Sequence, residues 1–179
     1  MPTPSCIQQT YQRIRSILSE ARAGAYRAIN AAMVAAYWEI GRVIIEEEQQ
    51  GQQRAGYGKG LLVELSQRLS TEFGRGFDRT NLQQMRAFYL DYPIRDALRP
   101  ELSWTHYRLL LRVDKPEARA FYEVEAVNSR WSTRELERQI HSLLFERLAL
   151  SRDREGVLAL AEVFQHATDW HTRRPPRGA

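Results

Sequence analysis

The residues whose types and spacing could do chemistry lie on one side of a predicted helix that begins after Asp78. Leu82, Met85 and Tyr89 form its apolar stripe. The other sides carry the small and polar residues: Thr80, Gln83, Gln84 and Ala87, with Arg79 and Arg86 beside them and Arg75 in the preceding turn. Glutamine pairs with adenine edges, arginine with phosphate or guanine, and threonine or alanine contacts the thymine methyl group. The pattern predicts a surface that reads nucleic acid; its alternative is an ordinary amphipathic helix with a solvated outer side.

The segment before this helix has the layout of a helix-turn-helix unit. A helix is predicted over 61–73, a glycine-containing turn over 74–77, and Asp78 is typical of an N-cap. The second helix of such a unit reads bases with its N-terminal residues. We therefore expect Thr80, Gln83 and Gln84 to face bases, and Arg75, Arg79 and Arg86 to hold phosphates.

A second cluster spans residues 102–108 and reads Leu-Ser-Trp-Thr-His-Tyr-Arg. Trp104 and Tyr107 are predicted to lie in the core of a helix capped by Ser103. His106 and Arg108 are added to the candidate nucleic-acid-binding residues, although a hydrogen-bonded structural histidine is the open alternative at His106.

The charge balance agrees with a polyanionic partner. The chain has 179 residues, a net charge of +4 and a pI near 9.5. Only Lys59 and Lys115 are lysines among 26 basic residues, so arginine supplies the rest. Arginine binds phosphate through a planar fork and stacks on bases. A GC-rich genome, which encodes arginine in place of lysine, would produce the same ratio.

Known catalytic and cofactor patterns are absent from the sequence. The single cysteine allows neither a disulfide framework nor a cysteine zinc site. Gly58-Lys59 is followed by Gly60 rather than Ser or Thr, so it does not form a phosphate-binding P-loop. The acid that metal nucleases place two residues before a lysine is missing, since Tyr57 and Val113 stand there. We expect no cofactor, no metal site and no catalytic residues; the grouping of His166, Asp169 and His171 reads as a solvated turn.

Helical periodicity dominates the whole chain and predicts an all-α fold of about seven or eight helices. An apolar stripe repeats every three or four residues near the N-terminus, and Gly24 is expected to loosen that helix before the pattern resumes over 29–44. Gly41 would allow a close approach of two helices. The remaining expectations are a loop over 49–60, a helix capped by Asp114 with Pro116 in its first turn, a helix capped by Ser132 and continuing through Leu144, a last turn or two over 157–163, and a disordered polar tail over 172–179.

Several segments, in order along the chain, resemble one known family. They are 37–42 (Tyr-Trp-Glu-Ile-Gly-Arg), 57–59 (Tyr-Gly-Lys), 73–77 (Phe-Gly-Arg-Gly-Phe), Asn81 and Leu82, Met85 and Arg86, Phe88 and Tyr89, 102–107, Arg119 with Phe121 and Tyr122, and 131–136 (Trp-Ser-Thr-Arg-Glu-Leu). Together they are similar to the N-terminal domain of YhcG-type PDDEXK nucleases, a family of poorly defined function. The likeness spans 7–161. Residues 102–136 are also similar to the region after the helix-turn-helix of ParB-like DNA-binding proteins.

The resemblance implies a helical targeting domain that a nuclease domain normally follows. We expect the domain to occupy 7–161, a divergent and disordered tail to occupy 162–179, and the catalytic part to be missing, so that this chain is not an enzyme. It would be a truncated or stand-alone copy, or would work with a separately encoded nuclease domain.

The leading hypothesis is a non-catalytic DNA-binding domain. The alternative is a helical module that forms a homodimer or docks a nuclease partner, because the apolar stripe running from Ile7 to Ile44 is longer than one short helix needs. The start of the chain lacks a secretion signal, and no apolar run approaches the roughly 20 residues of a membrane span, which predicts a cytoplasmic protein without a membrane partner. The sequence leaves open the choice between DNA and RNA.

Overall fold

The computed structural model describes residues 4–50 and 57–150, and this part of the chain is entirely helical. Seven α-helices and two short 3-10 helices follow one another: α1 (Pro4–Gln50), α2 (Tyr57–Phe73), η1 (Arg75–Phe77), α3 (Arg79–Asp91), η2 (Arg95–Ala97), α4 (Trp104–Leu110), α5 (Pro116–Asn128), α6 (Thr133–His141) and α7 (Leu144–Leu150). The predicted all-α fold is confirmed.

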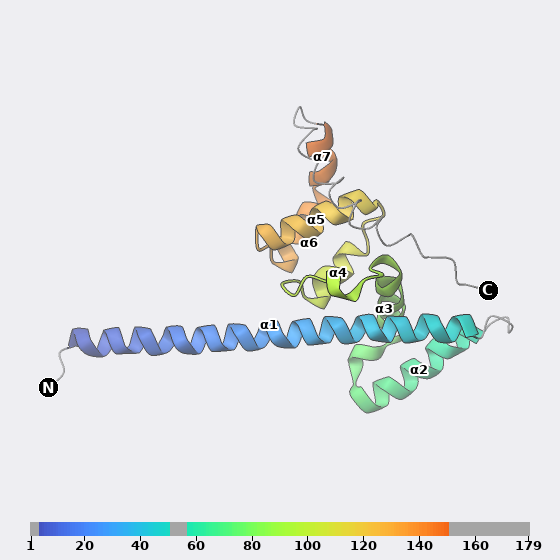
Figure 1. Ribbon diagram of the computed structural model, residues 1–179, viewed down its shortest axis with the longest axis horizontal. Helices are drawn as coiled ribbons and strands as arrows, with labels where there is room; N and C mark the ends of the chain where they lie inside the picture. The colour runs from blue at the N-terminus through green and yellow to red at the C-terminus, as the bar shows by residue number, and fades with distance from the viewer. Residues whose placement is uncertain (1–3, 51–56, 151–179) are drawn as a thin grey trace, which may run out of the picture.

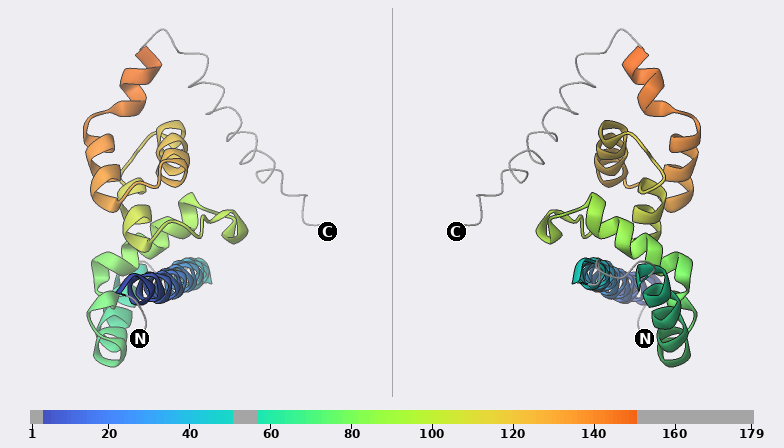
Figure 2. Two further views of the ribbon diagram at one scale, coloured as in Figure 1. Left: turned by 90° about the vertical axis from the view of Figure 1, so that its left-hand side faces the viewer. Right: turned by 90° about the vertical axis from the view of Figure 1, so that its right-hand side faces the viewer.

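α1 is the axis on which the other helices are assembled (Figure 1). α2 and α3 lie against its C-terminal half, on different sides, and α4 to α7 stack outward beyond α3. Seen along α1, the body forms a column that rises from one side of that helix (Figure 2). The N-terminal half of α1 extends past the body without a neighbour among the described helices.

Two boundaries near the N-terminus differ from the predictions. α1 is one continuous helix of 47 residues, so the predicted loosening at Gly24 is wrong. A glycine inside a helix costs only about 1 kcal/mol, and the helix-favouring alanines on both sides of Gly24 outweigh it. The predicted loop is also shorter than 49–60, since α1 reaches Gln50 and α2 begins at Tyr57.

Two further helix boundaries differ from the predictions for reasons that periodicity does not reveal. Lys115, not Asp114, is the N-cap of α5, and Pro116 starts that helix as predicted. The single helix predicted after Ser132 is broken at Leu143, whose φ is 51°. The backbone N–H of Phe145 donates to the Tyr122 hydroxyl at 3.2 Å, so a tertiary contact fixes the start of α7. The turn expected over 157–163 and the tail over 172–179 lie outside the described residues.

The buried residues form two connected cores. The smaller core joins α1, α2 and α3 through Ile44, Leu62, Leu82 and Met85. The larger core contains Phe88, Tyr107, Leu110, Phe121, Tyr122 and Leu136, and α1 adds Val34 and Trp38 to it. Trp104 packs against both cores, and its indole Nε1 donates to Asn81 Oδ1 at 3.0 Å. α1 and α3 therefore take part in both cores and connect α2 to the rest of the body.

The contact between α1 and α3 requires a glycine at position 41. A Cβ atom placed on Gly41 would lie 2.1 Å from the carbonyl oxygen of Met85 and 2.8 Å from its carbonyl carbon. Both are backbone atoms within α3, so no side chain can rotate away to make room. The predicted close approach at Gly41 is confirmed, and its partner is α3.

Gly41→Ala should destabilise the protein, because the new methyl group forces α1 and α3 apart. We expect the free energy of unfolding to fall by about 2 kcal/mol, the usual effect of overpacking a tight contact. Gly60→Ala is the matched control in α2, since a Cβ there meets nothing within 4 Å. It should raise the free energy of unfolding by up to about 1 kcal/mol through helix propensity. Urea denaturation followed by circular dichroism measures both, and equal stabilities would contradict the importance of the contact.

Candidate nucleic-acid interface

The turn between α2 and α3 is held in one shape by backbone conformation and by side chains of α3. Gly74 has φ 88°, a value that favours glycine. Asp78 is the N-cap of α3 and accepts from the backbone N–H of Asn81 at 2.9 Å, as predicted. The Asn81 amide nitrogen in turn donates to the carbonyl of Gly76. The start of α3 is thus fixed relative to α2, which is the geometry that a reading helix needs.

Four of the predicted residues lie together in solvent at this end of α3. Arg75 in η1 and Arg79, Thr80 and Gln83 in α3 are all exposed. Neither arginine forms an ion pair with any residue that the structure describes, so both guanidinium groups are available to a phosphate.

Two other predicted residues are engaged in the packing of α3. Arg86 Nε contacts Glu48 Oε2 of α1 at 2.6 Å, and the Glu48 side chain is only 19% exposed. Gln84 is partly buried, and its Oε1 atom is inaccessible and has no hydrogen-bond partner among the described residues. The outward side of α3 is therefore narrower than the sequence suggested, because Arg86 is paired with α1 and Gln84 is partly buried.

His106 serves the fold at the start of α4. Its Nδ1 lies 2.7 Å from the Ser103 hydroxyl and accepts from the backbone N–H of Ser103, and its Nε2 lies 3.1 Å from the carbonyl of Trp131. Burial lowers the pKa of His106, against an opposing effect of the Trp131 carbonyl. Both ring nitrogens have partners within the fold, which fits the hydrogen-bonded structural histidine that the sequence left open. A nucleic-acid contact of His106 stays a prediction.

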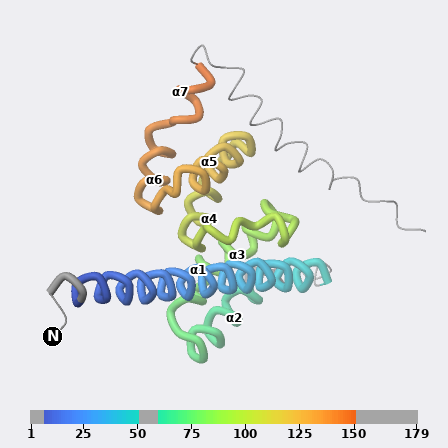
Figure 3. Tube along the Cα trace, turned by 60° about the vertical axis from the view of Figure 1, so that its left-hand side comes forward, coloured from blue at the N-terminus to red at the C-terminus, as the bar shows by residue number. Residues whose placement is uncertain are grey.

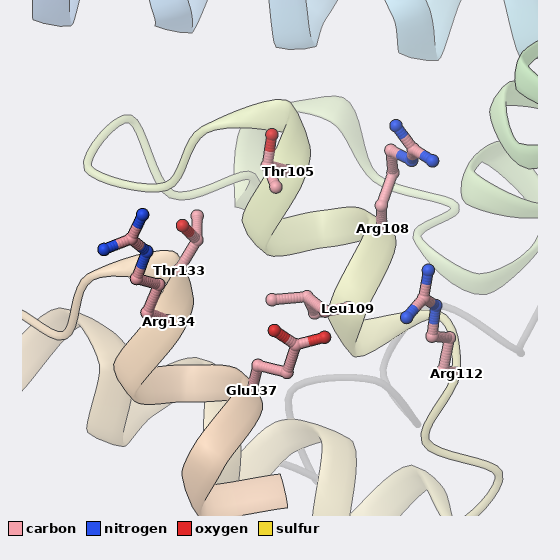
Figure 4. A pocket seen from close by; sticks show the side chains of 7 residues that line it. All are labelled: Thr105, Arg108, Leu109, Arg112, Thr133, Arg134 and Glu137. Carbon is pink, nitrogen blue, oxygen red and sulfur yellow. The ribbon is translucent and has the colours of Figure 1, made fainter.

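Arg108 belongs to a second basic site, a hollow of about 200 Å³ between α4 and α6 (Figure 4). The hollow is lined by Thr105, Arg108, Leu109, Arg112, Thr133, Arg134 and Glu137. In Figure 4 Arg134 and Thr133 lie on one side, Arg108 and Arg112 on the other, and the Glu137 carboxylate lies beside Leu109 between them. The Nε atom of Arg108 is inaccessible and unpaired within the described part of the chain.

Sequence reasoning missed Arg112 and Arg134 because the contact of α4 with α6 brings them together across 22 positions. One signal was available. Arg108 and Arg112 are four residues apart, and like charges at this spacing repel each other on a helical turn. None of the three arginines forms an ion pair among the described residues. Glu137 adds one negative charge, so the hollow carries a net positive charge.

The comparisons with known proteins match most of this chain. Residues 13–147 match the family described as the DUF1016 N-terminal domain. The chain belongs to this family. It is also 36% identical over 188 aligned positions to a protein of Escherichia coli (strain K12) named "Putative nuclease YhcG", and the match covers 87% of this chain and 50% of that protein. The chain thus spans about half the length of this curated relative. No solved structure matches significantly.

In the described part of this DUF1016 N-terminal domain, no group of three His, Cys, Asp or Glu side chains could hold a metal ion. Among the carboxyl groups of the described residues, Glu123 alone has a raised pKa, of about 7, because burial disfavours its charge more than Arg99 and Arg119 favour it. Arg99 Nε lies 3.7 Å from Glu123 Oε1, and Arg119 pairs with Asp91 at 2.8 Å. Arg99 thus ties α5 to the segment before α4, and Arg119 ties α5 to the C-terminal end of α3.

The raised pKa of Glu123 should make the stability of the domain depend on pH. Between pH 4.5 and about 7 the folded state keeps a proton that the unfolded chain releases. The free energy of unfolding therefore falls as pH rises through this window. Glu123→Gln should remove this component, whereas the exposed Glu47→Gln should keep it.

Urea denaturation at several pH values measures the effect as the difference between the two variants. That difference isolates Glu123, since the lowered pKa of His106 acts in the opposite direction in both variants. Identical pH profiles would contradict the assignment.

Proposed function

We propose that this domain binds DNA through the exposed N-terminal end of α3 and has a targeting rather than a catalytic role. The observation that carries the proposal is the grouping of Arg75, Arg79, Thr80 and Gln83 in solvent, directly after a rigid turn. Arginine and helix N-termini favour phosphate, and Thr and Gln suit base edges in the major groove. Arg75 and Arg79 would hold phosphates, and Thr80 and Gln83 would face bases.

The hollow between α4 and α6 supplies a second set of phosphate contacts in this proposal. Arg108, Arg112 and Arg134 line it and form no ion pair among the described residues, and the hydroxyl groups of Thr105 and Thr133 add neutral donors. Glu137 opposes an anion, so its charge should weaken binding rather than strengthen it. A duplex that spans both sites would explain why the chain combines a modest net charge with local clusters of unpaired arginine.

The relative suggests what the domain would target. That protein is named as a nuclease, and this chain matches half of it. We infer that the domain directs a nuclease domain, carried on the same chain or on a separate one, to DNA in the cytoplasm. α1 is long and apolar enough to cross a membrane by length and composition. However, its C-terminal half buries Val34, Trp38 and Ile44 in the cores, which supports a role in the body of a water-soluble domain.

Removal of the α3 arginines should weaken DNA binding and its dependence on salt. Each phosphate contact contributes about 0.9 to the slope of log affinity against log salt. Arg75→Ala combined with Arg79→Ala should therefore lower that slope by about 2. Arg13→Ala combined with Arg27→Ala is the matched control, since both are exposed residues of α1 and form no part of the proposed interface. Fluorescence anisotropy with labelled duplex DNA at several salt concentrations measures both. Undetectable binding at low salt, or equal losses in the two variants, would refute the proposal.

Substitutions in the hollow should act in opposite directions if it contacts phosphate. Arg112→Ala combined with Arg134→Ala should weaken binding and lower the salt slope by about 2. Glu137→Gln should strengthen binding, because it removes the one negative charge that lines the hollow. The same anisotropy titration reports both variants. If both leave the affinity unchanged, the hollow is not part of the interface, and α3 alone carries the proposal.

A second candidate function is protein interaction through α1. The observation that favours it is the exposure of large apolar side chains along the N-terminal half of this helix, which monomeric soluble proteins rarely leave uncovered. A nuclease domain or a second copy of the chain could cover this surface. Interaction and DNA binding use different parts of the molecule and are compatible with each other.

A further inference from the structure

The N-terminal half of α1 is an apolar helix that nothing in the described structure covers. Ile7, Tyr11, Ile14 and Leu18 are between 52% and 57% exposed, and Ile17 is 65% exposed. This stretch runs clear of the other helices in two views (Figures 1 and 3). Side chains of this size are normally buried, and a row of them along one helix is typical of a contact with another helix.

The spacing along this half of α1 is that of a coiled-coil seam. Eight exposed residues follow one another at alternating intervals of four and three: Ile7, Tyr11, Ile14, Leu18, Ala21, Ala25, Ala28 and Ala32. The repeat covers nearly four heptads, the length over which such a pattern indicates a coiled coil. Its composition is uneven, since the first four members are large and the last four are alanine.

We propose that a second copy of this chain covers the seam, in antiparallel orientation, with Ile7 of one copy opposite Ala32 of the other. Reversing the helix against itself pairs every large residue with an alanine: Ile7 with Ala32, Tyr11 with Ala28, Ile14 with Ala25, and Leu18 with Ala21. All four layers then have similar total volume, so two straight helices can pack at one separation. This self-complementarity identifies the occupant, because a two-fold interface pairs a surface with itself.

A flanking position follows the same rule. Ile17, the most exposed large apolar residue of this part of the helix after Tyr26, lies beside the seam and would face Gly24 of the second copy. A parallel pair would instead oppose large residues with large ones over the first half and alanine with alanine over the second. The two halves would then require different interhelical distances, since this distance depends on the side chains at the contact.

Charge argues weakly against the antiparallel pairing, and the packing argument outweighs it. In that arrangement Arg15 of one copy lies near Arg22 of the other, on both sides of the two-fold axis. Both side chains are exposed, so solvent and salt screen their repulsion. The same contact makes the orientation testable, because a carboxylate at position 15 would turn the repulsion into attraction.

The body of the protein leaves the seam accessible to a second copy. α1 contacts the body through residues such as Val34, Trp38 and Ile45. At 3.6 residues per turn, Ala32 lies about 200° around the helix from Val34, and the other seam residues stay near that side. The second helix can therefore lie along the seam without meeting α3 or the α4–α7 column.

The mass in solution of the full chain tests the proposal. Sedimentation equilibrium should give a dimer at micromolar concentration. Ile14→Glu combined with Leu18→Glu should give a monomer with unchanged helix content, since both side chains are already exposed. Gln9→Glu combined with Ala23→Glu adds the same charge to the opposite, exposed side of the helix and should leave the dimer intact. A monomeric wild-type chain would overturn the proposal. The seam would then be left to residues 151–179, a lipid bilayer or another protein.

Two further measurements test the orientation. Arg15→Glu should strengthen the antiparallel dimer at low salt and would have no such effect in a parallel one. In a Cys6→Ser background, Ile14→Cys and Ala25→Cys chains should form disulfides when mixed and not when alone. Disulfides within each single variant would indicate a parallel pair and overturn the antiparallel assignment.

The inference rests on the proposed interaction function of α1 and not on DNA binding. The two proposals can fail separately. The mass of the chain is measured without DNA, and DNA binding is measured by anisotropy on the monomeric variant.

Discussion

The close contact of α1 with α3 is the constraint on which the rest of the structure depends. Gly41 lets the Met85 carbonyl approach α1 more closely than any side chain would permit, and the contact of Arg86 with Glu48 holds the same two helices farther along. Leu82 and Met85 then close the core with α2, and Phe88 on the neighbouring side of α3 carries the second core. Both cores therefore fix α3 in place, and Arg79, Thr80 and Gln83 remain exposed at its N-terminal end.

The fold could be predicted from the sequence wherever local chemistry decides it. Asp78, Ser103 and Ser132 cap helices because their side chains satisfy backbone N–H groups within three residues, which a reader of the sequence can see. The break at Leu143 could not be seen in this way, because its cause is a hydroxyl group on Tyr122 in another helix. The continuity of α1 through Gly24 could not be predicted either, because a glycine indicates local flexibility but not the stability of the helix around it.

The candidate site shows the same difference between features set by the local sequence and features set by long-range contacts. The exposure of Arg79, Thr80 and Gln83 follows from helical periodicity, once the apolar stripe of α3 is identified. The engagement of Arg86 depends on Glu48, 38 positions earlier, and the hollow around Arg108 depends on the meeting of α4 and α6. Long-range pairs of this kind leave no periodic trace in the sequence. The residues that sequence reasoning placed correctly are therefore those whose surroundings are set by their own helix.

An antiparallel pairing of α1 would set the spacing of the two DNA-binding ends. The two-fold axis would pass between Leu18 and Ala21, and Gly41 marks the place where α3 joins α1. With a rise of 1.5 Å per residue, the two Gly41 positions would lie roughly 65 Å apart. Two reading helices that enter successive major grooves on one face of a duplex lie only about 34 Å apart. The dimer would consequently hold two separate stretches of DNA, or two turns of one duplex, instead of a compact palindromic site. α1 would then act as a spacer between the two DNA-binding ends. This role explains why α1 is far longer than its packing against the rest of the domain requires, and why so rigid a contact joins it to α3.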